Sequence, residues 1–340
     1  MLVPAWFTAR IRRKRSKSKR PAATRRLDGL SGIPHADESV QRRFHHVLGI
    51  DLGGGKGKKT ALATLRVDGA TATVVDIAPR PGAAPFYDPS LLDTIRAYGD
   101  ETLLCIDAPL TLPPCLRCEV PVCPGQSACV DSSVVEMRAL AAEATETRDD
   151  MQASGSSGDR FGLRGTRDTR RGKPSITPYT QRPTEIHLAA NVGIAAREGL
   201  GQGTGPLAAR AAHLVRALAD RFTINQNLIE VYPKATLVAL GLGAPFKKHL
   251  RERETRARVL ESLSGELRFG PGVWRERCVQ SDHLFEAVIC AFTGFLWARD
   301  GWSLPVYTTA RDESARLRDG WIWTPPVAAA PAQKKTAAEG

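Results

Sequence analysis

The sequence predicts an α/β protein built on a mixed β-sheet, and three observations support this fold class. Short apolar segments typical of strands alternate with longer segments of helical period. Two of these segments, Val47–Asp51 and Thr102–Asp107, are apolar along nearly their whole length, which is typical of strands buried on both faces. No run reaches the roughly 18 apolar residues that a membrane helix requires, so we expect no membrane span.

The first elements follow an ordered pattern. Val47–Asp51 is followed by glycines and then by two further strand-like segments, Thr60–Val67 and Thr71–Ile77. A short helix, Ser90–Tyr98, precedes the apolar strand Thr102–Asp107. Three antiparallel-looking strands, a helix and a buried strand form the opening of the ribonuclease H-like fold, which few other α/β folds share. We therefore expect a ribonuclease H-like mixed five-stranded sheet flanked by helices.

The rest of the chain adds a Cys-rich insertion and extra helices. Leu228–Tyr232 is expected to be the fifth strand, and Trp321–Trp323 is a candidate terminal strand. The last long helix has apolar residues on most sides and should be buried. Helices are expected over Val134–Arg148, Thr184–Glu198, Pro206–Arg221, Lys247–Ser264 and Asp282–Asp300.

Positive charge is concentrated in the N-terminal tail. Residues 1–44 hold 12 Lys or Arg and three Asp or Glu, so they carry +9 of the net +12. Their mutual repulsion and scarce apolar surface predict a disordered basic tail, and residues 326–340 also have a composition typical of disorder. The expected folded domain spans residues 45–325, with a Cys cluster at 115–129 and a mobile basic insertion at 151–182. No secretory signal is apparent, so we expect a cytoplasmic protein.

Acidic residues stand where the predicted strands end. Asp51 ends the first strand, Asp107 ends the fourth, and Glu230 lies in the fifth. Asp282 and Glu286 are four residues apart on the last helix and so share one face. A carboxylate at the end of an apolar strand is costly unless it is hydrated, paired or bound to a cation. Because strand ends gather at the ligand-binding edge of open α/β sheets, we hypothesise that these five residues are catalytic.

Clustered carboxylates repel one another, and a divalent cation relieves that repulsion. Mg²⁺ or Mn²⁺ prefers oxygen ligands such as those of Asp51, Asp107, Glu230 and Glu286. A pair of such ions would activate a water and stabilise the leaving oxygen in phosphodiester cleavage. The alternative is that some of these acids are salt-bridge partners or helix caps. Asp282, which follows Ser281, could simply cap its helix.

Six short motifs occur in an order that resembles a known family. They are Gly49–Gly53, Ile106–Leu110, Pro178–Arg182, Ile229–Pro233, Ser281–Ala287 and Asp319–Trp323. Together they resemble the domain of unknown function 429 family, described as predicted nucleases of ribonuclease H fold, over about residues 46–325. The resemblance implies that Asp51, Asp107, Glu230 and the acids of the last helix form the acidic centre of a nuclease that acts on nucleic acid. The family often has Asp at the position of Glu286, which leaves the metal geometry there open.

The resemblance also implies substrate-binding residues. Tyr179, Arg182 and Glu185 would line the acidic centre, where an Arg could bind a phosphate through two hydrogen bonds. For Tyr179 and Arg182, the alternative is that they anchor an ordered loop. Lys56 and Lys58, in the glycine-rich segment after the first strand, are further candidate phosphate ligands. This segment is not a P-loop, because neither Ser nor Thr follows its Gly-Lys pair.

Four cysteines form a separate candidate site. Cys115, Cys118, Cys123 and Cys129 follow the pattern C-x2-C-x4-C-x5-C. Without a secretory signal, disulfides are disfavoured, and four clustered thiols suit tetrahedral zinc or an iron–sulfur cluster. Redox-active thiols, or no ligand role, are the alternatives. The loop follows Asp107 directly, so a bound metal would stiffen the wall of the acidic centre. That role would be structural rather than catalytic, because four thiolates leave no open position on the metal.

Two rival functions remain open at the level of sequence. The segment Asp51–Gly54 resembles the first phosphate motif of sugar kinases and actin-like ATPases, which share the superfold and would be phosphotransferases. Those proteins duplicate the fold, and we find no convincing second copy here. The other rival is a non-catalytic nucleic-acid-binding module, which would bind without Mg²⁺. The sequence does not distinguish DNA, RNA or a small nucleotide as substrate, and it does not indicate the oligomeric state.

Overall fold

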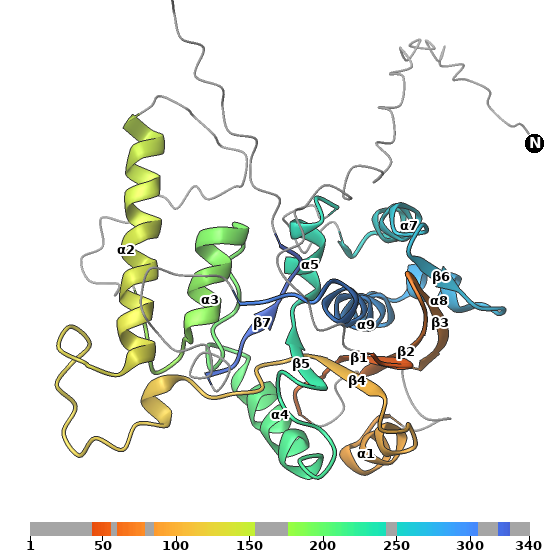
Figure 1. Cartoon of the computed structure of the whole chain (residues 1–340), viewed down its shortest axis with the longest axis horizontal. Coiled ribbons are helices and arrows are strands. Elements are labelled where there is room, and N and C mark those ends of the chain that lie inside the picture. Colours follow the sequence, from red (N-terminus) through yellow and green to blue (C-terminus); the bar gives the residue numbers. More distant parts are fainter. Residues whose placement is uncertain are drawn as a thin grey trace, which may run out of the picture. The chain divides into compact units, whose positions relative to one another are not determined.

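The described part of the chain has an α/β fold with a seven-stranded mixed sheet and eight α-helices (Figure 1). This computed structural model describes residues 43–55, 60–78, 85–153, 176–242, 250–304 and 319–326, with the backbone alone over 143–153. All of these residues belong to the unit Asp37–Gly340. Most of the predicted tails, and residues 154–175 of the predicted insertion, lie outside the described residues.

The two most apolar strands lie next to each other near the centre of the sheet. β1 (His46–Asp51) pairs in parallel with β4 (Thr102–Asp107) and antiparallel with β2 (Ala61–Asp68). β3 (Thr71–Ala78) follows on the β2 side, and β5 (Leu228–Val231) follows on the β4 side. The strand order is β6-β3-β2-β1-β4-β5-β7. Helices cover both faces at the centre of this sheet, which explains why β1 and β4 are apolar on both sides.

The sheet has two more strands than the five expected, one at each edge. β6 (Leu267–Phe269) pairs in parallel with β3, and β7 (Ile322–Trp323) pairs in parallel with β5. Segments of three and two residues are too short to show the alternation by which strands are recognised in a sequence. The candidate strand at Trp321–Trp323 corresponds to β7.

One face of the sheet is covered mainly by α9 (Asp282–Asp300), which packs on β1, β2 and β4. α5 (Pro233–Ala239), α7 (Arg253–Ser262) and α8 (Trp274–Gln280) complete this side of the core (Figure 1). As predicted, α9 is buried along most of its length. In the part of the chain that the structure describes, none of the helices combines the length and apolar character needed to cross a membrane.

The opposite face carries a second core. α1 (Asp88–Arg96) and α4 (Gly205–Ala217) pack there against side chains that alternate with those of the first core along each strand (Figure 1). In β1, for example, Val47 belongs to the α9 side and Leu48 to the α1–α4 side. This alternation fixes the strand register, because a shift by one residue would exchange the two faces.

A smaller group of helices lies beside the sheet. α2 (Ser132–Ala153) and α3 (Pro183–His187) share a separate apolar cluster. The sequence predicts a single helix over Thr184–Glu198, but α3 instead passes into a π-helical turn at Leu188–Val192. Gly193 ends this turn with a φ of 72°, a left-handed conformation that glycine adopts readily.

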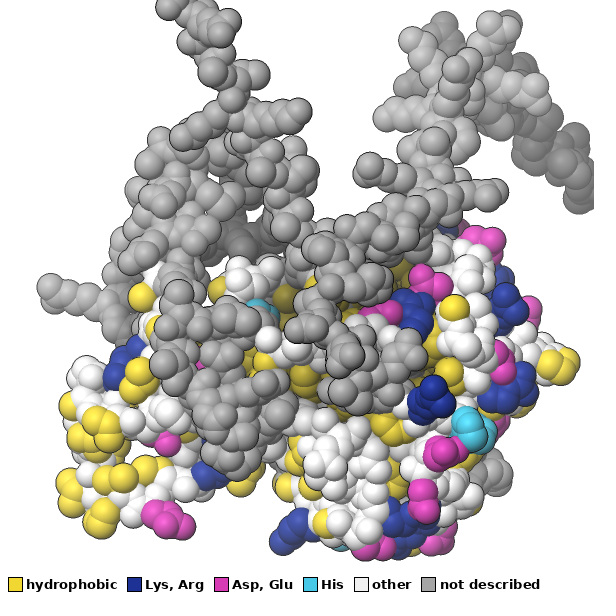
Figure 2. All heavy atoms as spheres, in the orientation of Figure 1, with side chains coloured by type: hydrophobic (Ala, Val, Ile, Leu, Met, Phe, Trp, Pro, Cys, Tyr) yellow, Lys and Arg dark blue, Asp and Glu magenta, His cyan; other side chains and the backbone are white. Residues whose placement is uncertain are grey.

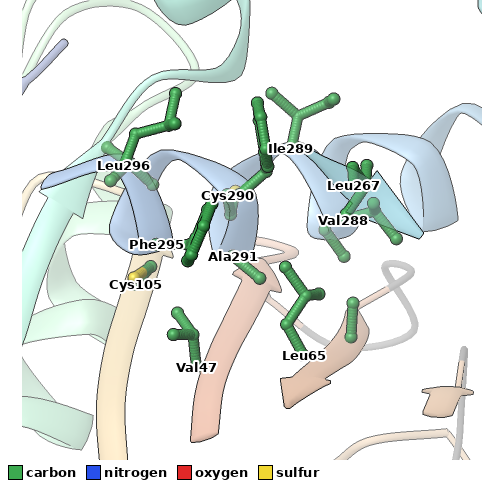
Figure 3. Close-up of a cluster of buried hydrophobic side chains, with 14 of the residues drawn as sticks. Val47, Leu65, Cys105, Leu267, Val288, Ile289, Cys290, Ala291, Phe295 and Leu296 are labelled. Atoms are coloured by element: carbon green, nitrogen blue, oxygen red, sulfur yellow. The ribbon is translucent and has the colours of Figure 1, made fainter. Parts of the chain in front are cut away.

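Two glycines allow α9 to approach the sheet closely. Gly49 of β1 faces the backbone of α9, where an added Cβ would overlap Ala287 and Ala291. Gly294 of α9 faces the sheet, where an added Cβ would overlap the Cys105 side chain. Figure 3 shows this contact layer, with Cys105 and its strand neighbours directly beneath α9. The position of α9, and of the residues at its N-terminus, is therefore set by close backbone packing.

Substitution of Gly294 by Ala should destabilise the protein. Ala improves helix propensity by about 1 kcal/mol, but the new methyl group must displace the Cys105 thiol, and such overpacking costs about 1–3 kcal/mol. We expect Gly294→Ala to lower the urea midpoint. The control is Gly205→Ala in α4, where an added Cβ meets open space and the midpoint should stay or rise. An equal response of both variants would contradict close packing at Gly294.

Candidate acidic metal centre

Two predicted acidic residues lie side by side at one edge of the sheet. Asp51 is the last residue of β1, Asp107 is the last residue of β4, and the two are register partners. The pairing is parallel, so both carboxylates stand at the carboxyl ends of their strands, where open α/β sheets bind ligands. Asp107 is partly buried and Asp51 is buried. Neighbouring strands lie about 4.8 Å apart, and side chains at paired positions point to the same face of the sheet, so the two carboxylates are neighbours at this edge.

The first turn of α9 brings two more ligands to this edge. His283 and Glu286 are three residues apart and lie on one face of the helix. Each of Asp51, His283 and Glu286 offers one ligand atom, and these atoms lie within 4.8 Å of one another. No other set of three or more His, Cys, Asp or Glu side chains meets this criterion among the described residues. Two carboxylates and an imidazole form a donor set that suits Mn²⁺ and related divalent ions.

The start of α9 is fixed by its cap. The side chain of Ser281 accepts a hydrogen bond from the Leu284 amide, at 3.4 Å. Asp282 begins the helix, and its carboxylate accepts a hydrogen bond from the His283 amide at 3.0 Å. Asp282 is not in the group of three, so the structure brings Glu286, and not Asp282, next to Asp51. Negative charge in the first turn is favourable because of the helix dipole.

Negative charges accumulate around Asp107. Burial raises its pKa well above the ordinary value, and repulsion from Asp51, Glu286 and Glu230 adds to the rise. Burial and the charge of Asp107 also raise the pKa of Tyr232 to about 12. In the absence of a cation, Asp107 therefore holds a proton more strongly than an ordinary Asp does.

His283 is charged more readily than an ordinary histidine. Its Nδ1 lies 2.5 Å from Oδ2 of Asp51. This hydrogen bond is the main reason that the pKa of His283 is raised above 6.5, and the charge of Asp51 adds to it. The imidazolium form stabilises Asp51, whereas only the neutral form can bind a metal through the same nitrogen.

Three residues of this region were not identified from the sequence. His283 and Tyr232 lie inside recognised motifs, but no ligand role was assigned to either. The spacing of His283 and Glu286 on one helix face was the available signal. Arg197 is exposed, and its charge lowers the pKa of Asp107 and of Tyr232, so it lies close to the acidic edge. The sequence predicted a helix over Thr184–Glu198, but Arg197 lies in an irregular segment, so helical periodicity gave no correct indication of its position.

Glu230 has a different environment from the other acids. Its two carboxylate oxygens accept hydrogen bonds from Arg182, at 2.7 and 2.6 Å. The Leu110 amide donates to one of the same oxygens at 3.0 Å. Arg182 also pairs with Glu185, and all three charged side chains are buried. Burial alone would lower the pKa of Arg182, but the two glutamates raise it above its ordinary value.

The predicted substrate-binding residues differ in their exposure to solvent. The Arg182 side chain is fully buried, and its guanidinium is directed at Glu185, Glu230 and Thr111 rather than at solvent. Tyr179 is 55% exposed. Lys56 and Lys58 lie outside the described residues.

The four clustered cysteines lie between β4 and α2 as free thiols. Among the described residues no three of their sulfurs come within 4.8 Å of one another. A preformed four-thiolate cage is therefore not shown.

Removal of the Arg182 charge should destabilise the protein strongly. Arg182→Met leaves two buried carboxylates without their partner, which typically costs about 3–5 kcal/mol. The control is Arg275→Met, which breaks an exposed pair with Glu261 worth at most about 1 kcal/mol. Urea denaturation at neutral pH measures both. Because protonation of the glutamates relieves the unpaired charge, the deficit of Arg182→Met should shrink as pH falls. A deficit no larger than that of the control would contradict a buried ion-pair network.

Binding of Mn²⁺ at the acidic edge should weaken as pH falls. Protons on His283 and Asp107 compete with the ion, and both groups have raised pKa values, so the competition extends above pH 6.5. Isothermal titration calorimetry over a pH series should show tighter binding at higher pH, and fewer protons released on binding as pH rises. His283→Gln should flatten this dependence, whereas His213→Gln, at an exposed position on α4, should not. Affinity independent of pH in the unmodified protein would argue against these ligands.

Comparison with known families gives one match. A family model described as "Protein of unknown function (DUF429)" matches residues 49–310, which is more than half of the chain. Comparisons with curated proteins and with solved structures gave no match. This match confirms the family resemblance expected from the sequence, and the chain belongs to the DUF429 family.

Proposed function

We propose that this protein is a divalent-metal-dependent nuclease that hydrolyses phosphodiester bonds. The observation that carries the proposal is the convergence of Asp51, His283 and Glu286 within 4.8 Å, beside the register partner Asp107. These ligands come from two strand ends and one helix, although they are far apart along the sequence. A shared divalent cation would offset the repulsion among these carboxylates and would explain why they lie together.

The central sheet supports a ribonuclease H-like topology for this nuclease. The five longest strands lie in the order β3-β2-β1-β4-β5, and β2 is antiparallel to both of its neighbours. The sequence predicted three antiparallel-looking strands, a helix and a buried strand at the start of this fold, and the directions of β1, β2 and β3 are compatible with that pattern. The additional edge strands β6 and β7 extend the sheet without changing its centre.

The chemistry divides between the ion and the protein. A bound Mg²⁺ or Mn²⁺ would lower the pKa of a water molecule and stabilise the oxygen that leaves. Asp51, Asp107 and Glu286 would hold the ion, with His283 as an additional ligand or as a proton acceptor. Arg197 is exposed and its charge lowers the pKa of Asp107, so we propose that it contacts the substrate phosphate.

Glu230 and Arg182 would act indirectly in this scheme. Their ion pair occupies both oxygens of Glu230 and fixes the Leu110 amide, three residues beyond Asp107. We therefore propose that Glu230, Arg182 and Glu185 position the strand ends rather than contact the substrate.

The distribution of charge favours a small nucleic-acid footprint. On the face drawn in Figure 2, acidic and basic side chains are interspersed over the described residues. A large duplex footprint usually requires several clustered phosphate contacts from Lys and Arg. Short or single-stranded nucleic acid is therefore the substrate class that we propose.

Asp51→Asn and Asp107→Asn should each abolish cleavage of single-stranded DNA or RNA in the presence of Mn²⁺. Each variant removes an anionic ligand while conserving side-chain size, so the fold should be retained. Asp93→Asn, an exposed position on α1, is the matched control and should cleave normally. Cleavage is measured on labelled oligonucleotides, and folding is checked by circular dichroism.

The same assay separates the proposal from its rivals. Full cleavage by both folded variants would eliminate the acidic centre as the active site. Nucleic-acid binding that needs no divalent ion, with no cleavage by the unmodified protein, would instead indicate a non-catalytic binding module.

A further inference from the structure

The segment that joins β4 to α2 has no apolar core of its own. After the short 3-10 helix at Pro114–Leu116, the described chain forms only turns and irregular structure up to residue 131. We call residues 115–130 the cysteine loop. Figure 2 shows hydrophobic side chains gathered at the lower left, where Figure 1 draws this loop. Exposed aliphatic residues in it are Leu116, Val120, Val122 and Val130. A loop that buries so little apolar surface needs another source of order.

All four clustered thiols belong to this loop. Cys118 and Cys123 are exposed, Cys115 and Cys129 are half-buried, and none forms a disulfide. The four thiols follow one another within this one short loop, in the pattern C-x2-C-x4-C-x5-C. Four neighbouring thiols that repel one another as thiolates form a donor set that a metal stabilises.

The two ends of the cysteine loop are held in place. The Cys115 amide donates to the carbonyl of Pro178 at 3.1 Å. Arg138 of α2 donates to the carbonyls of Gln126, Ser127 and Cys129, at 2.6, 3.1 and 3.0 Å. The half-buried Cys115 and Cys129 are therefore fixed by the protein, and the two exposed cysteines lie between them along the chain.

We propose that the cysteine loop binds a thiolate-ligated metal centre through Cys115, Cys118, Cys123 and Cys129. A single tetrahedral zinc with bonds of about 2.3 Å would require sulfurs about 3.8 Å apart. No three of the four described sulfurs come within 4.8 Å, so the loop would have to close around one zinc ion. An iron–sulfur cluster binds its thiolates to different irons and so accepts a wider spacing. The centre is structural, because four thiolates leave no open position.

The centre would also order one side of the acidic edge. Arg117, between the first two cysteines, donates to the carboxylate of Asp319. The hydroxyl of Thr111 donates to the Asp319 carbonyl and accepts from Arg182 at 3.1 Å. Arg182 in turn holds Glu230. A chain of hydrogen bonds therefore connects the cysteine loop to β5, while the metal proposal itself does not depend on nuclease activity.

The test is the metal content of the full-length protein, purified without chelators under anaerobic conditions. Zinc, iron and acid-labile sulfide are measured per chain. We expect a stoichiometric centre, either as iron with sulfide and visible absorbance or as zinc alone. Cys118→Ser/Cys123→Ser should lose it, whereas Val122→Ser in the same loop should retain it. Asp51→Asn should also retain it, which separates this centre from the acidic one.

Alkylation of the unmodified protein gives a second readout that does not require the variant to fold. A bound metal should protect the exposed Cys118 and Cys123 from iodoacetamide until the centre is removed by chelation or oxidation. Rapid alkylation of both thiols in the freshly purified protein, together with the absence of zinc and iron, would overturn the proposal. Equal metal content in the double Ser variant and the unmodified protein would overturn it as well.

Discussion

Repulsion among carboxylates at one edge of the sheet is the constraint around which this molecule is organised. β1, β4 and β5 each carry an acidic residue at or near their carboxyl ends. The protein compensates each one differently. Arg182 pairs with Glu230, His283 pairs with Asp51, and the raised pKa of Asp107 favours its protonated form. The pairing of Glu230 is internal and buried, whereas a cation could replace the protons on the other groups.

Close packing converts this electrostatic arrangement into a defined site. Gly49 and Gly294 let α9 lie directly on the central strands, so the first turn of the helix meets the end of β1. A helix held further away would separate His283 and Glu286 from Asp51. Such precision requires rigid secondary structure on both sides, and here each ligand belongs to a strand or to a long buried helix. The hydrophobic core and the candidate metal centre therefore depend on the same contact.

The buried ion pairs extend this order beyond the sheet. Arg182 stands at the start of α3 and joins β5 to the chain that follows Asp107. Through Thr111 and Asp319 the same network reaches Arg117 in the cysteine loop. Buried charges seldom add stability relative to apolar packing, but they allow few alternative arrangements. Their role here would be to fix how the peripheral helices and the cysteine loop meet the acidic edge.

The sequence by itself determined the long buried strands, the helix α9, the family and the acids that end the strands, because each leaves a local pattern. The short strands β6 and β7 were missed or only suggested, since two or three residues carry no periodicity. Only the tertiary structure decided which side chain pairs with each carboxylate. Arg182 and Glu230 are 48 residues apart, and His283 and Asp51 are 232 apart. No local rule predicts such partners, because side-chain pairing at this distance follows from how the strands and helices pack.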